Sequence, residues 1–114
     1  MNDLTMAALD DALRGLAMRQ RATANNVANV QTPGYLAERV GFESSLRDAI
    51  DGGMAQPMRT TTTLSTDPVR QDGNNVNLDD ELLGLQQTNL RYQTMVEGMN
   101  AKFRLLRTAI RGEA

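Results

Sequence analysis

The chain has 114 residues, a formal net charge of −2, no His and no Cys, so it forms one small domain at most. The missing His and Cys exclude Cys and His nucleophiles, His general bases, disulfides and most zinc or haem sites. The slightly acidic balance argues against a general nucleic-acid binder, and only four aromatic residues with no Trp indicate an aliphatic, Met-rich core.

Residues 1–31 are predicted to form an amino-terminal coiled-coil helix, because apolar residues recur at spacings of four and three. The stripe consists of Leu9, Leu13, Leu16 and Val27, and polar Gln20 and Thr23 interrupt it. No basic segment followed by an apolar one begins the chain, so we expect no cleaved signal peptide. No apolar run approaches the ~18 residues of a membrane span, so we expect no transmembrane segment.

A sharp turn is predicted after this helix, followed by a short second helix within residues 32–50. Pro33 disfavours helical geometry at Thr32, and Gly34 permits a positive φ before Tyr35. A short helix is expected at about residues 42–50. Its Phe42 and Leu46, four residues apart, share one face.

Three asparagines lie in the last turns of the amino-terminal helix, and a helix does not need them. Asn25, Asn26 and Asn29 are weak helix formers whose amides both donate and accept hydrogen bonds. We therefore expect them to contact other chains rather than their own. Tyr35 is expected to pack at the bend.

Residues 51–76 are predicted to be a flexible or extended middle segment. Gly, Pro, Thr and Asp are frequent in it, and its isolated apolar residues are too few to form a core. The string Asp72-Gly73-Asn74-Asn75 suggests a calcium loop but does not fit one, because Asn77 stands in place of its Gly and Leu83 in place of its Glu. We expect no metal, no cofactor and no enzymatic activity.

Residues 77–112 are predicted to form a carboxyl-terminal coiled-coil helix of about 34 residues. Asn77 is a suitable N-cap, and the four-three spacing continues without a slip, with Asn89 as its only polar member. The stripe comprises Leu78, Leu82, Leu85, Tyr92, Val96, Met99, Phe103, Leu106 and Ile110. The predicted fold is all-α: two long terminal helices in a coiled-coil-like hairpin, joined by a flexible polar middle segment.

The string from Asn25 to Tyr35 resembles a signature of the axial proteins of the bacterial flagellum. That family places Asn-Asn-Ile-Ala-Asn, two variable residues and Thr-Pro-Gly-Tyr near the amino terminus, and here Val27 stands in place of Ile. The resemblance continues through residues 39–43 and resumes over residues 72–112, where it is closest to the rod proteins of the basal body. Residues 48–71 carry none of it.

The resemblance implies a structural subunit of the flagellar rod that polymerises into a helical tube. It also implies as partners copies of itself, other rod proteins, the rod-to-ring adapter, the membrane ring and the flagellar type III export apparatus. The expected location is the basal body. Phe42 and Leu46 resemble the element that an export gate recognises, and ordinary packing is the rival interpretation. The alternative function is a non-flagellar helical adapter or a rod component of another secretion apparatus.

Overall fold

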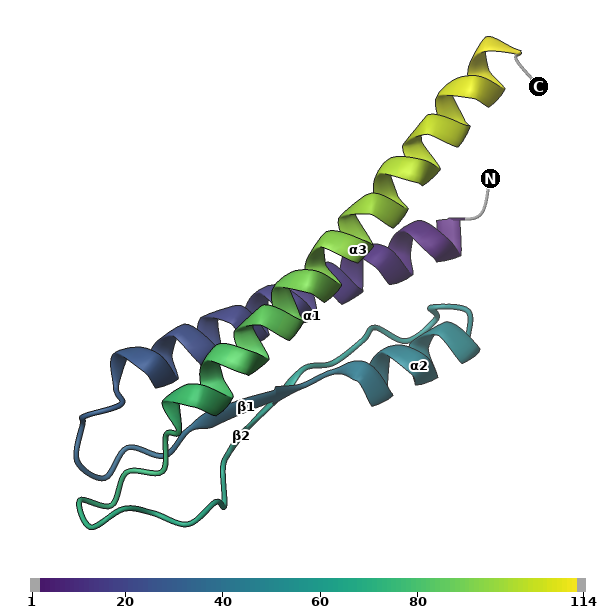
Figure 1. The fold of residues 1–114 in the computed structure, drawn as a ribbon. Coiled ribbons are helices and arrows are strands. Elements are labelled where there is room, and N and C mark those ends of the chain that lie inside the picture. Colours follow the sequence, from purple (N-terminus) through teal and green to yellow (C-terminus); the bar gives the residue numbers. More distant parts are fainter. Residues whose placement is uncertain (1–2, 113–114) are drawn as a thin grey trace.

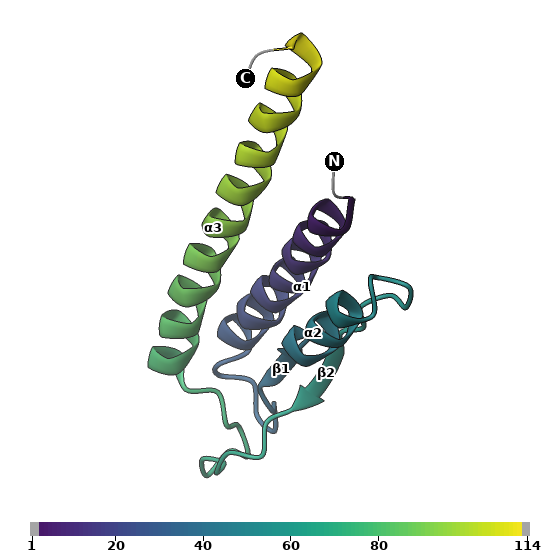
Figure 2. The same ribbon diagram turned by 90° about the vertical axis from the view of Figure 1, so that its right-hand side faces the viewer.

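The computed structural model describes residues 3–112, so Met1 and Asn2 of the predicted amino-terminal segment lie outside the described residues. The elements are α1 (Asp3–Ala28), β1 (Glu38–Gly41), α2 (Glu43–Asp51), β2 (Thr61–Leu64) and α3 (Leu78–Arg111). They form an elongated molecule with principal extents of 65 × 25 × 14 Å in which α1 and α3 run antiparallel (Figure 1). In Figure 2, α1 lies between α3 on one side and α2 with the two strands on the other.

The long carboxyl-terminal helix is confirmed, and both of its ends have a local cause. The side-chain oxygen of Asn77 accepts a hydrogen bond from the Asp80 N–H at 3.2 Å, and three acidic residues occupy the first turn. Gly112, with φ of 74°, ends the helix in the left-handed conformation that suits glycine. The helix has 34 residues and is therefore about 51 Å long.

The expectation of an all-α fold is wrong in one respect, because two strands form a small antiparallel sheet. Glu38 lies opposite Leu64, and Gly41 lies opposite Thr61. The threonines of β2 are β-branched and favour extended backbone, whereas sequence analysis assigned them to coil. The fold is mostly helical, with long terminal helices and a two-stranded sheet between them.

The short second helix is confirmed as α2, which follows β1 directly. Phe42 is its N-cap residue, and the Phe42 carbonyl accepts the Leu46 N–H at 2.8 Å. Leu46 is half-buried and Ala49 is buried. The first turns of α2 thus place Phe42 against α1.

The middle segment differs from the loose chain that its composition indicates. Beyond β2, hydrogen bonds connect it to the rest of the molecule, including Gly34 N–H to Asp72 O at 2.8 Å and Asn75 N–H to Tyr35 O at 3.2 Å. Asn74, Asn75 and Val76 are buried, and Val76 is only 1% exposed. Polar groups hold this end of the segment in place, and the flexibility of the remainder stays a prediction.

The apolar core is small and lies on the side of α1 that faces the sheet and α2. Its buried residues are Ala12, Leu16, Ala22, Ala37, Val40, Phe42, Ala49 and Val76. Between α1 and α3, polar side chains pair: Gln20 donates to Asn89 at 2.5 Å. These two residues are interruptions of the two predicted stripes, so they fix which turns of the helices face each other.

Candidate functional site

The two sequence segments that carry the family resemblance meet at one end of the helical hairpin. We call residues 25–35 and 72–81 together the motif junction. Two glycines face each other across this junction: a Cβ added to Gly73 would lie 3.3 Å from the Gly34 Cα. Both residues have positive φ, 76° at Gly34 and 83° at Gly73. Only glycine combines this conformation with such close backbone contact.

Asn26 is the centre of the motif junction, and it is completely buried. Its side-chain oxygen accepts the Glu38 N–H at 2.8 Å and the Tyr35 hydroxyl at 3.3 Å. Its side-chain NH2 donates to the Glu38 carbonyl at 3.0 Å and to the Glu81 carboxylate at 3.1 Å. The expectation that Asn26 contacts other chains is therefore wrong, because all of its hydrogen-bonding capacity is used within its own chain.

Asn29 is also used locally, whereas Asn25 is not. The Asn29 NH2 donates to the Asn25 carbonyl at 2.8 Å, and its oxygen accepts from the Thr32 hydroxyl at 3.0 Å. These two contacts lie within its own chain, and a further contact of Asn29 with another chain stays a prediction. The Asn25 side chain is exposed, so its contact with another chain stays a prediction. Thr32 and Pro33 are exposed in the turn.

Two further asparagines complete the junction from the other motif. The Asn74 NH2 donates to the carbonyls of Asn29 at 2.8 Å and Thr32 at 2.9 Å, which lie just beyond the end of α1. The Asn75 oxygen accepts the Ala37 N–H at 2.7 Å. The Gly-Asn-Asn motif thus supplies partners for backbone groups that the turn leaves unpaired.

Glu81 is a buried acid that the sequence did not single out, since three successive acidic residues at a helix start suit the helix dipole. Only 3% of it is exposed, and its carboxylate pairs with the Arg39 guanidinium at 2.7 Å. Burial, followed by the negative charges of Glu38 and Glu81, raises the pKa of the Tyr35 phenol. No local signal identified Glu81, because its partners lie 42 and 55 residues away.

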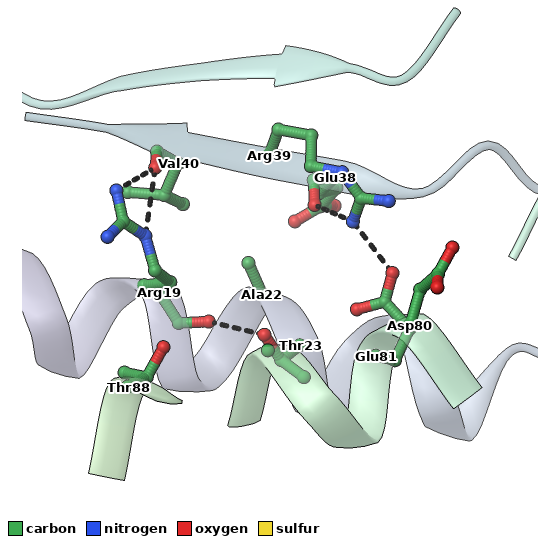
Figure 3. Close-up of a pocket in the computed structure, with 10 residues that line it drawn as sticks. Arg19, Ala22, Thr23, Glu38, Arg39, Val40, Asp80, Glu81 and Thr88 are labelled. Atoms are coloured by element: carbon green, nitrogen blue, oxygen red, sulfur yellow. Dashed lines mark hydrogen bonds and ion pairs between the residues drawn. The ribbon is translucent and has the colours of Figure 1, made fainter. Parts of the chain in front are cut away.

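A cavity of about 410 Å³ lies between α1, β1 and the start of α3 (Figure 3). Its two arginines are engaged: Arg19 donates to the Val40 carbonyl, and Arg39 to the Glu38 carbonyl and the Glu81 carboxylate. The Thr23 hydroxyl in its lining is engaged as well, because it donates to the Arg19 carbonyl at 3.0 Å. Among residues 3–112, no cluster of acidic side chains is arranged to hold a metal ion.

Phe42 is only 5% exposed and lies against α1 at Gly15. The Arg19 guanidinium lies 4.8 Å from the centre of its ring, within the range of a cation–π contact. Arg19 also donates to the Glu43 carboxylate at 2.5 and 2.7 Å. These hydrogen bonds lower the pKa of Glu43 to about 2, against the raising effect of its partial burial. Of the predicted export element, Phe42 is therefore covered in the folded subunit, whereas Leu46 is half-buried.

The predicted stripes are covered unequally. On α1, Leu16 is buried, while Leu9, Leu13 and Val27 are half-buried. On α3, no stripe residue is fully buried. Leu85, Tyr92, Val96, Met99 and Leu106 are half-buried, and Leu78, Leu82, Phe103 and Ile110 are exposed. Among the described residues, no helix is long and apolar enough to cross a membrane.

Comparison with known proteins gives the family. No family model matches the chain. A flagellar basal body rod protein FlgB from Bacillus subtilis is 34% identical, over 95% of this chain and 94% of its own length. Proteins of the same description from Aeromonas hydrophila and Escherichia coli K12 are 30% and 27% identical, each over 90% of this chain and 89% of their own length. The chain belongs to the FlgB family of flagellar basal-body rod proteins and is a structural subunit of that rod.

Proposed function

We propose that this subunit polymerises with copies of itself and other rod proteins into a helical tube that joins the membrane ring to the more distal rod. The observation that supports this is the uncovered stripe of α3: Leu82 is 46% exposed, Phe103 44% and Ile110 84%. A monomer that leaves such a stripe in water gains free energy when a neighbour covers it. The rod-to-ring adapter is the partner expected at the ring. An adapter of a non-flagellar apparatus is not favoured by the relatives.

Phe103→Ala tests this function because Phe103 lies in the stripe but contributes little to the monomer. A buried Phe replaced by Ala costs about 3–5 kcal/mol, and at 44% exposure the free subunit should lose well under that amount. We expect the variant to fold, yet fail to restore rods and swimming to a strain that lacks the wild-type subunit. Gln93→Ala, at an exposed polar position of the same helix, is the control and should restore both. Normal swimming with Phe103→Ala would show that this face is not the assembly surface.

We further propose that the chain is exported through the flagellar type III apparatus without a cleaved signal peptide, with Phe42 and Leu46 as the element that the gate recognises. Phe42 is 5% exposed in the folded subunit, so the gate must meet it before α2 packs on α1. The order of events in this proposal is therefore recognition first and folding later.

Phe42→Ala should lower the ratio of secreted to cytoplasmic subunit. Loss of the buried ring also destabilises the fold, so the control is Leu16→Ala, because Leu16 and Phe42 line one small cavity between α1 and α2. Leu16 is 2% exposed, and its loss should change abundance without lowering that ratio. Quantitative immunoblots of both fractions give the measurement. An equal fall for both variants would make Phe42 a packing residue only.

A further inference from the structure

The end of α3 runs past the start of α1 (Figures 1 and 2). A Cβ added to Gly98 would lie 3.6 Å from Leu9 Cδ2, so these two residues face each other. Because the helices are antiparallel, residue 104 is level with Asp3, where α1 begins. We call residues 103–111 the α3 extension, and roughly 10 Å of it has no α1 alongside.

The α3 extension is both apolar and basic. Phe103 is 44% exposed, Leu105 56% and Ile110 84%. Arg104, Arg107 and Arg111 alternate with them, and the extension contains no acidic residue. Within residues 3–112 none of these three arginines forms an ion pair. Apolar and basic groups on one exposed helix end indicate an apolar partner surface on an acidic element.

A groove with those properties lies on the same molecule, between the first turns of α1 and α2. We call it the α2 groove; it holds about 400 Å³ and is lined mainly by Leu4, Leu9, Leu46, Ile50 and Met95. Residues 3–14 contain three aspartates and one arginine, a formal charge of −2. In α2, Glu43 pairs with Arg19 and Arg91, which leaves Asp48 and Asp51 to meet a basic partner. In the part of the chain that the structure describes, Asp48 and Asp51 form no ion pair.

We propose that the α3 extension of one subunit binds in the α2 groove of a second copy of this chain. The extension cannot reach its own groove, since α3 continues as a helix to Arg111 and points away from it. A parallel neighbour displaced along the helix axis by about the length of the extension brings the two surfaces together. Different surfaces meet on the two copies, so the contact does not close and propagates as a helix. This inference rests on the rod function proposed above.

Disulfide crosslinking tests this contact cleanly, because the chain has no Cys. Ile50→Cys and Ile110→Cys replace exposed residues, 39% and 84% exposed, so both variants should fold. The two single variants carry different tags, are co-expressed in a strain lacking the wild-type subunit, and are oxidised in isolated basal bodies. We expect mixed-tag dimers at roughly tenfold the yield obtained when Gln86→Cys, an exposed position near the other end of α3, replaces Ile50→Cys.

The variant with both substitutions in one chain distinguishes an open contact from a closed one. An open contact gives a ladder of dimers, trimers and larger species, and a product that stops at dimers would overturn the proposal. The proposal would also be overturned if the yield of mixed-tag dimers were no higher than in the Gln86→Cys control while the cells still swim. That result would mean that another partner covers the α2 groove, and it would leave the rod function intact. Normal swimming by the strain that lacks this chain altogether would instead count against the rod function.

Discussion

At the scale of single residues, Asn26 replaces a neighbouring β-strand. Its amide pairs with both the N–H and the carbonyl of Glu38, which is what the backbone of an adjacent strand would do. The same amide also binds Tyr35 and Glu81. Sequence reasoning identified the asparagines as unusual in a helix, but it could not tell which one is buried. The partners of Asn26 lie 9, 12 and 55 residues away in the sequence, and hydrophobic periodicity carries no information about such contacts.

Asn26→Ala should destabilise the free subunit strongly. The substitution removes four hydrogen bonds, among them those to the Glu38 N–H and to Oε2 of the buried Glu81, so we expect a loss of about 2–4 kcal/mol. Asn25→Ala is the matched control: that side chain is exposed one residue earlier, and its change should stay within about 0.5 kcal/mol. Urea unfolding followed by circular dichroism measures both. Equal effects of the two variants would contradict the role assigned to Asn26.

At the scale of elements, the packing of α2 on α1 depends on one glycine. Sequence analysis predicted a helix through Gly15 without a reason for glycine there, although glycine costs a helix about 1 kcal/mol relative to Ala. The structure supplies the reason: a Cβ on Gly15 would lie 2.5 Å from the Phe42 ring. The sheet was not predicted for a related reason. The pairing of β1 with β2 is a contact between distant segments, and no local sequence pattern connects the two.

Gly15→Ala should therefore destabilise the subunit, against its helix propensity. Overpacking of a buried contact costs about 1–3 kcal/mol, which outweighs the gain of about 1 kcal/mol in propensity. Gly84→Ala is the control within α3, where nothing lies within 4 Å of the added Cβ, and it should stabilise. In thermal unfolding, the melting temperature should fall for Gly15→Ala and rise for Gly84→Ala. Stabilisation by both would mean that Phe42 does not pack on Gly15 in solution.

At the scale of the whole molecule, sequence reasoning predicted the long helices but not what holds their far end together. Periodicity is strong over residues 78–111, so the hairpin and its stripe followed from it. The motif junction did not follow, since hydrogen bonds between asparagine side chains and distant backbone groups leave no periodic signal. The result is a molecule with a small apolar core at its centre, a polar junction at one end and an uncovered helix at the other.

Limited trypsin digestion can compare the two ends of the middle segment, because each end contains one arginine. Sequence analysis predicted the whole of this segment to be flexible or extended. Arg59 lies outside any helix or strand, and within residues 3–112 its only hydrogen bond runs from its backbone N–H to the Ser45 hydroxyl at 2.7 Å. The Arg70 guanidinium instead donates to the carbonyls of Val30 at 2.5 Å and Val76 at 2.7 Å. Trypsin needs a locally unfolded segment, so within residues 30–90 the first cut should follow Arg59. Mass spectrometry distinguishes this cut from short losses at the α3 extension. A first cut after Arg70 would show that the motif junction opens before the β2 connection does.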